Sequence, residues 1–64
     1  SLMTEYGLSK RQIEVAKLVV QGFTNIEISE KLFINENTVK QHVNKIYKKC
    51  QVPNRWSLMS LYSQ

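Results

Sequence analysis

Residues 24–46 read TNIEISEKLFINENTVKQHVNKI, and the local signals in this stretch decide the fold. Thr24 is followed three residues later by Glu27, which is the capping-box pattern that begins an α-helix. Ile28 and Leu32 lie one helical turn apart and give this helix an apolar face. We therefore predict a short amphipathic helix that begins after Thr24 and ends near Leu32.

A second helix follows within the same stretch. Asn35 is a favoured N-cap residue, and the carboxylate of Glu36 suits the positive end of a helix dipole. Apolar residues then recur at helical spacing along the helix: Val39, Val43, Ile46 and Cys50. Only residues 33–35 join the two helices, so the helices must cross at a steep angle, as in a helix-turn-helix, although the glycine often found in such turns is absent. The alternative is an ordinary helical hairpin within an unrelated bundle.

Two further helices flank this pair. Ser9 and Gln12 repeat the capping-box pattern and begin a helix over residues 10–21. The positions that we expect to form its apolar face are Ile13, Ala16 and Val20. After a break that contains the only proline, Asn54 caps a last short helix over residues 55–62.

The chain of 64 residues has room for one small domain. No stretch alternates apolar and polar residues as a β-strand does, so the fold class is all-α, a compact four-helix domain that contains a helix-turn-helix. We assign this domain to residues 8–64. Residues 1–7 show no periodicity and are interpreted as a tail or linker, in which Ser1-Leu2 is readable as a remnant of cloning.

The positive charge lies in the second half of the chain. Residues 1–36 hold four Lys or Arg and five Glu, whereas residues 37–64 hold five Lys or Arg and no acid. An anionic partner is therefore plausible, although a charged stretch is also what an ordinary solvated helix face shows.

Several classes of protein are excluded or disfavoured. The longest apolar run, residues 18–20, is far too short to span a bilayer, and no signal peptide opens the chain. One cysteine, Cys50, and one histidine, His42, make neither an internal disulfide nor a metal-ligand set, so no metal and no cofactor are expected. An enzyme is the weakest reading, because no nucleophile and base stand at motif spacing. We expect a cytoplasmic protein without a membrane partner.

The helix that follows Asn35 carries polar side chains opposite its apolar stripe. Lys40, Gln41, Asn44 and Lys48 cluster there, since each residue advances the helix by about 100°. Amide side chains pair with adenine in the major groove and lysine donates to guanine, so this mixture favours base recognition over phosphate neutralisation alone. The same residue types are also common on any solvated helix face.

The segment LSKRQIEVAKLVVQGFTNIEISEKLFINENTVKQHVNKIYKKCQVPNR, residues 8–55, closely resembles the LuxR/GerE-type helix-turn-helix, which is also the output domain of NarL/FixJ response regulators. The most specific parts are LSKRQIEV, QGFTNIEIS, KLFINENTVKQHV and the closing KK-x-x-V-x-NR, in order and without gaps. The sequence departs from the usual family pattern mainly at positions that affect helix packing: Ala16, Ser29, Cys50 and Gln51. The resemblance implies a four-helix DNA-binding domain whose third helix enters the major groove and whose fourth helix forms a homodimer contact.

The resemblance also implies roles for individual residues. The base-reading residues would be Lys40, Gln41 and Asn44, and Lys45 and Lys48 would lie near the DNA backbone. At helix starts, where exposed amides favour anions, the phosphate contacts would be Thr24, Asn25 and Thr38. For Thr24, helix capping is an equally good explanation, and one residue can do both.

The last helix has more apolar surface than one core face needs. Leu58, Leu61 and Tyr62 share one side, and Trp56 and Met59 point elsewhere. We interpret Trp56 and Met59 as a dimer contact, because paired half-sites need paired DNA-binding domains. Packing against the N-terminal tail or against an absent domain is the alternative.

These inferences predict the output domain of a bacterial transcription regulator that binds duplex DNA sequence-specifically, as a homodimer. RNA polymerase is a further candidate partner. The family usually ends just after the fourth helix, so we expect the C-terminal part of a longer protein with an upstream receiver or ligand-binding domain, a free-standing regulator being the alternative. The rival functions are a promoter-binding domain like region 4 of a sigma factor, and a protein-interaction module that does not bind DNA.

Overall fold

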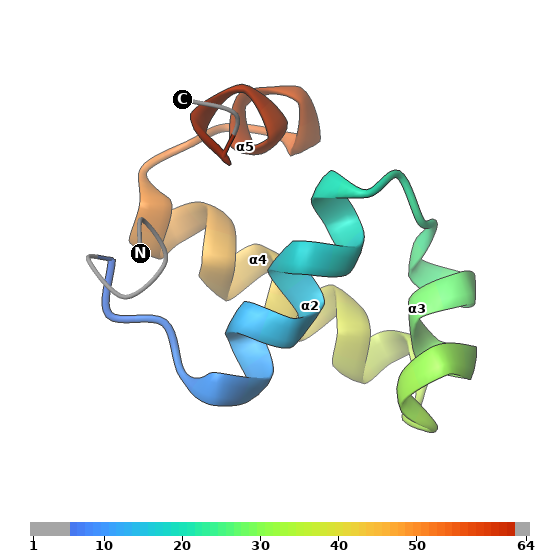
Figure 1. Ribbon diagram of the computed structural model, residues 1–64. Helices are drawn as coiled ribbons and strands as arrows, with labels where there is room; N and C mark the ends of the chain where they lie inside the picture. The colour runs from blue at the N-terminus through green and yellow to red at the C-terminus, as the bar shows by residue number, and fades with distance from the viewer. Residues whose placement is uncertain (1–5, 63–64) are drawn as a thin grey trace.

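The computed structural model describes residues 6–62, which form four helices around one core (Figure 1). With the labels of Figure 1, the helices are α2 (Lys10–Val20), α3 (Asn25–Leu32), α4 (Glu36–Cys50) and α5 (Arg55–Tyr62). No strand occurs within this described range. The all-α, four-helix fold expected from the sequence is therefore confirmed.

Both predicted capping boxes are formed. The Ser9 hydroxyl accepts a hydrogen bond from the Gln12 backbone N–H at 3.2 Å, and the Gln12 side-chain oxygen accepts one from the Ser9 N–H at 2.9 Å. Thr24 and Glu27 exchange the same two bonds at 3.2 and 2.9 Å. Each box satisfies amide groups that have no partner within the helix, so α2 and α3 begin at the residues that the sequence predicts.

The turn between α3 and α4 has no glycine, and a bulkier residue takes the left-handed conformation there. Phe33 has φ 57° and ψ 43°, and its backbone N–H donates to the Ser29 carbonyl. Two residues later, the Asn35 side chain accepts from the Asn37 N–H at 2.7 Å and caps α4. Gln51 ends α4 with φ 57° in the same way. A left-handed residue other than glycine costs about 1–3 kcal/mol, so the surrounding structure has to compensate at both turns. The residue after each, Ile34 and Val52, packs against the core.

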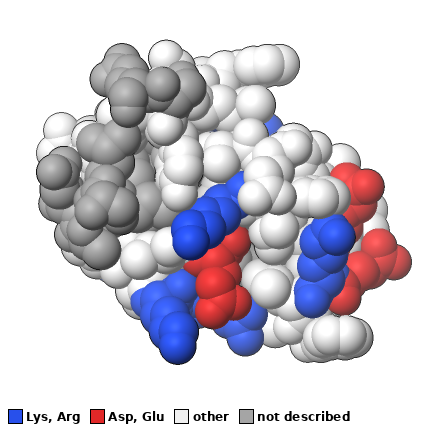
Figure 2. All heavy atoms as spheres, in the orientation of Figure 1, with Lys and Arg blue, Asp and Glu red and all other residues white. Residues whose placement is uncertain are grey.

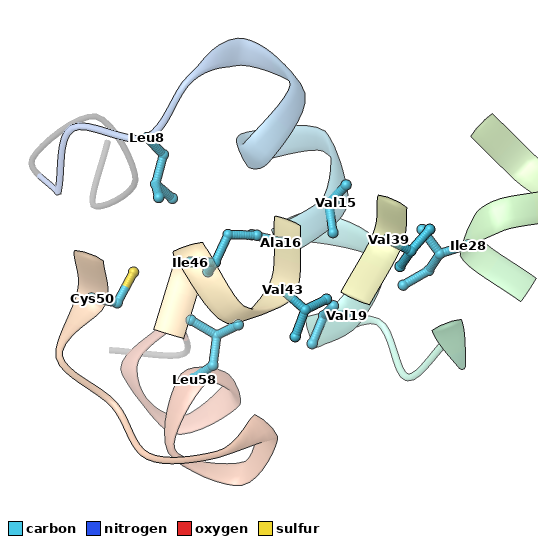
Figure 3. Packing of buried hydrophobic residues seen from close by; sticks show 10 residues of the cluster. All are labelled: Leu8, Val15, Ala16, Val19, Ile28, Val39, Val43, Ile46, Cys50 and Leu58. Carbon is cyan, nitrogen blue, oxygen red and sulfur yellow. The ribbon is translucent and has the colours of Figure 1, made fainter. Parts of the chain in front are cut away.

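The core lies where α2, α4 and α5 meet, and α3 covers one end of it (Figure 3). Helix α4 supplies a continuous buried stripe, as its spacing predicts. The buried apolar residues are Leu8, Val15, Ala16, Val19, Ile28, Val39, Val43, Ile46, Cys50 and Leu58. Because the buried stripe occupies one side of α4, the opposite side is left for contacts outside the domain.

The predicted apolar face of α2 was wrong in register. The sequence favoured Ile13 and Val20 together with Ala16, and Ile13 and Val20 are only half-buried. The residues that point into the core, besides Ala16, are Gln12, Val15 and Val19. Helix α2 contacts α3, α4 and α5, so its buried surface is wide and is centred about one position earlier than the sequence suggested.

Contacts with the folded part begin before residue 8. Tyr6 packs against the core, and the Lys49 ammonium donates to the Gly7 carbonyl and to the Gln12 side-chain oxygen, both at 3.0 Å. Two residues that the sequence assigned to the tail therefore lie against α2 and the end of α4. Residues 1–5, with Ser1-Leu2, lie outside the described range.

The start of α5 matches the expected cap. The Asn54 side chain accepts a hydrogen bond from the Ser57 N–H at 2.9 Å. Leu58 is 1% exposed and fixes α5 on the core, and Leu61 and Tyr62 pack at its margin. Figure 1 shows α5 at one end of the molecule and α3 at the other, with α2 and α4 between them.

Candidate nucleic-acid interface

The outward face of α4 carries the residues that the sequence singled out. Five of the predicted DNA-contact residues are exposed on this helix: Lys40, Gln41, Asn44, Lys45 and Lys48. Thr24, the N-cap of α3, is exposed as well. The five residues of α4 extend over two helical turns opposite the buried stripe, and an α-helix with such a face has the width to enter a major groove. Thr38 is half-buried in the first turn of the same helix.

A hollow of about 570 Å³ lies beside this face. Its lining comes from the starts of α3 and α5 and from α4, and consists of Thr24, Asn25, Ile26, Glu36, Lys40, Val43, Asn44, Tyr47 and Arg55. It therefore brings together two base-reading candidates and two backbone candidates from separate helices. The other four candidates, Thr38, Gln41, Lys45 and Lys48, do not line it.

Acidic and basic groups meet within the hollow. Lys40 Nζ lies 3.8 Å from Glu36 Oε2, one turn earlier on α4, and both side chains are about half exposed. Figure 2 shows the side of the molecule on which α2 lies in front of α4, and there too Lys and Arg side chains lie next to acidic ones.

Thr24 and Asn25 already have partners at the start of α3. The Thr24 hydroxyl caps the helix by accepting from the Glu27 backbone N–H, and the Thr24 backbone N–H donates to the Glu27 carboxylate. Hydrogen bonding by Thr24 to this carboxylate holds the pKa of Glu27 below its usual range. The Asn25 side-chain oxygen accepts from Arg55 Nη2 at 3.2 Å. The capping role of Thr24 is thus confirmed, and its phosphate contact stays a prediction.

Sequence reasoning did not assign a role to Arg55 or Tyr47, although both line the hollow. Arg55 stands in the closing NR of the segment that resembles the LuxR/GerE type, and that motif was the available signal. No local sequence pattern predicts the contact between Arg55 and Asn25, because the two residues are 30 positions apart.

The apolar residues proposed for dimer contact differ in exposure. Trp56 is 78% exposed, and Met59 is half-buried, on either side of the buried Leu58. Sequence reasoning overlooked two other exposed apolar side chains, Phe33 at 94% and Ile26 at 57%. Trp56 is the large apolar side chain of α5 that a partner would have to cover.

Other chemistry finds little support among the described residues. They contain no group of three or more His, Cys, Asp and Glu that could hold a metal ion. Cys50 is buried and unpaired, and burial raises the pKa of its thiol, so the reactive thiolate is disfavoured. No helix in the same range is long and apolar enough to cross a membrane.

Known proteins share much of the sequence of this domain. Residues 6–62 match the family described as bacterial regulatory proteins, luxR family. The chain is 45% identical over 47 residues to the uncharacterized transcriptional regulatory protein YxjL of Bacillus subtilis, which covers 73% of this chain and 22% of that protein. It is 46% identical over 48 residues to the transcriptional regulatory protein LiaR of the same organism, covering 75% and 23%.

A longer relative matches the same region. The HTH-type transcriptional regulator AlkS of Alcanivorax borkumensis is 44% identical over 52 residues, which are 81% of this chain and 6% of AlkS. The chain thus spans less than a quarter of the length of each of these curated relatives, which are named as transcriptional regulators and not as enzymes. No solved structure matches the chain. The helix-turn-helix of α3 and α4 and the match over nearly all of its residues show that the chain belongs to the luxR family of bacterial regulatory proteins.

Proposed function

We propose that this domain binds duplex DNA sequence-specifically, with α4 in the major groove. The observation that carries the proposal is the outward face of α4, where Lys40, Gln41 and Asn44 are exposed together. Asparagine and glutamine pair bidentately with adenine N6 and N7, and lysine donates to guanine. Lys45 and Lys48 on the same helix would neutralise flanking phosphates and supply affinity that does not depend on sequence.

The starts of two helices would position the DNA backbone. Thr24 and Asn25 stand at the first turn of α3, and Thr38 stands in the first turn of α4. Helix N-termini favour phosphate because their amide groups and dipole point toward it. The hollow supports this arrangement, because it is lined by Thr24 and Asn25 from α3 and by Lys40 and Asn44 from α4.

The domain would act as a dimer through α5. Trp56 is mostly exposed, and Met59 is one turn further along the same helix. Tryptophan is enriched among the residues that dominate binding at protein interfaces. A two-fold pair would present two copies of α4 to half-sites about 34–36 Å apart.

The proposal extends to a longer regulator. The relatives YxjL and LiaR are matched over 22% and 23% of their length, so most of each protein lies outside the matched region. We propose that an upstream receiver or ligand-binding domain controls whether two copies of this domain pair. The regulator would then act in the cytoplasm, where it would bind duplex DNA.

Selection from a randomised duplex pool, at moderate salt and with sequencing of the retained fraction, tests the proposal. Two spaced half-sites in the enriched sequences are the expected result. A single asymmetric element would favour promoter binding of the sigma region-4 kind, and retention without any motif would reduce the function to backbone binding. Absence of retention at low salt would overturn DNA binding and favour the protein-interaction module.

A further inference from the structure

The first residue of α5 reaches the DNA-facing side of the domain. Arg55 Nη2 donates to Asn25 Oδ1 at 3.2 Å, which joins the start of α5 to the start of α3 across 30 residues of sequence. The guanidinium is partly buried and lines the same hollow as Lys40 and Asn44. A helix expected to serve dimerisation therefore also places a cation beside the proposed DNA contacts.

The charge of this guanidinium is not neutralised by the contacts that it makes. Asn25 is neutral, and the two ion pairs within the described range join Arg11 to Glu14 and Lys40 to Glu36. Arginine has five N–H donors in a rigid fork, and the bond to Asn25 engages one of them. An anion with two oxygen acceptors is the complementary ligand, since guanidinium binds phosphate bidentately.

We propose that Arg55 is a DNA-backbone contact that binds one phosphate of a duplex lying across the hollow, while it holds Asn25 in place. The proposal rests on the proposed DNA-binding function and adds to it a residue from outside the helix-turn-helix. It follows that α5 contributes to DNA affinity directly, besides any part in dimerisation.

The rival explanation is that Arg55 only braces α5 against α3. Two substitutions separate the explanations, because they keep different properties of the side chain. Arg55→Gln keeps an amide donor for Asn25 and removes the charge, whereas Arg55→Lys keeps the charge and removes the fork. Arg11→Gln is the matched control, because Arg11 is an exposed arginine of α2 that pairs with Glu14 outside the hollow.

The measurement is the affinity of each variant for a labelled duplex of random sequence over a series of salt concentrations, with thermal unfolding by circular dichroism to confirm folding. The slope of log K against log salt is negative, and removal of one phosphate contact makes it less steep by about 0.9. This change corresponds to roughly tenfold weaker binding at about 0.1 M salt. We expect this change for Arg55→Gln, with a slope close to that of the wild type for Arg55→Lys and Arg11→Gln.

An unchanged slope in folded Arg55→Gln would overturn the phosphate contact and leave the proposed function standing. The double variant with Asn25→Ala provides a second check: if Arg55→Gln weakens binding without changing the slope, and its effect does not add to that of Asn25→Ala, then bracing explains Arg55. If the wild-type chain itself does not bind the duplex at low salt, both this inference and the proposed function fail.

Discussion

The ammonium of Lys40 is paired with the carboxylate of Glu36 inside the hollow that we propose to face DNA, at 3.8 Å and one helical turn apart. A residue proposed to recognise a base must leave this ion pair or share it with DNA. The acid also repels phosphate. Glu36 therefore opposes the attraction that the neighbouring cation exerts on any duplex, whatever its sequence.

We predict that Glu36→Gln raises affinity for random duplex DNA by up to about fivefold at low salt, in line with the roughly 0.2–1 kcal/mol that an exposed pair of charges contributes. The gain should shrink as salt rises, because exposed charges are screened. Fluorescence anisotropy titrations measure it, and Glu30→Gln serves as the control, since Glu30 is exposed on α3 and does not line the hollow. A fall in affinity for the selected site would instead indicate that Glu36 accepts a hydrogen bond from a base.

Asn44 tests base recognition most directly. If its amide pairs with a base, Asn44→Ala should lose about 1–3 kcal/mol of binding free energy on the selected site and little on random duplex. Paired titrations on the two duplexes give both numbers. Equal losses on both would contradict the assignment and leave Asn44 as part of a solvated helix face.

Local signals in the sequence were enough to predict where each helix begins and what α4 exposes. The capping boxes at Ser9 and Thr24 and the cap at Asn35 act over two or three residues, so the chain nearby contains all the information needed. The polar face of α4 follows from a stripe of four apolar residues and the helical repeat.

Contacts between distant residues could not be predicted in this way. Helix α2 has apolar residues on several sides, and its neighbours decide that Val15 and Val19 are buried more deeply than Ile13 and Val20. The bond between Arg55 and Asn25 depends on how α5 crosses the domain. The sequence pattern predicts which residues share a face of one helix, and it does not predict which faces of two helices meet.

Lys48 and Lys49 are neighbours in sequence with different surroundings. The Lys49 ammonium bonds to Gly7 and Gln12, whereas Lys48 is exposed on the proposed DNA face. We predict that Lys49→Met lowers the free energy of unfolding by about 1–2 kcal/mol, because charged hydrogen bonds are lost, and leaves the salt slope unchanged. Lys48→Met should instead leave the free energy of unfolding within about 0.5 kcal/mol of wild type. Its salt dependence of DNA binding should be less steep, by about 0.9 in the slope of log K against log salt.

Urea unfolding and salt titrations of the two variants provide the comparison. Loss of DNA affinity in folded Lys49→Met, with a reduced slope, would place that lysine on the DNA as well. A stability loss in Lys48→Met of the size expected for Lys49→Met would contradict the assignment of Lys48 to the exposed face.

The Glu27 carboxylate makes the start of α3 sensitive to acid. Hydrogen bonds from the backbone N–H and the hydroxyl of Thr24 are the main causes that lower its pKa, and Lys31 adds a smaller effect. A lowered pKa in the folded state means that the charged group stabilises the fold above its ordinary pKa and that this contribution disappears as pH falls through the folded value. The stability of wild type should therefore decrease in acid more than that of Glu27→Gln.

Urea unfolding followed by circular dichroism at neutral and acidic pH measures this difference. Glutamine can form the same capping box, as Gln12 does in α2, so Glu27→Gln removes the charge and keeps the cap. Parallel pH profiles for the wild type and Glu27→Gln would exclude Glu27 as a source of the acid sensitivity.

Trp56 is the only tryptophan of the chain and is 78% exposed. Its substitution can therefore test the proposed dimer contact, and its fluorescence can report burial of the indole in that contact. Because little of its surface is buried in the single domain, Trp56→Ala should change the stability by no more than about 0.5 kcal/mol. The same change should remove cooperative binding to a duplex with two half-sites and leave the affinity for one half-site unchanged. In the wild type, burial of the indole between two copies should shift its emission to shorter wavelength when the two-site duplex is added. Cooperative binding that survives Trp56→Ala, with no shift in the wild type, would mean that the two copies meet through another surface or bind independently.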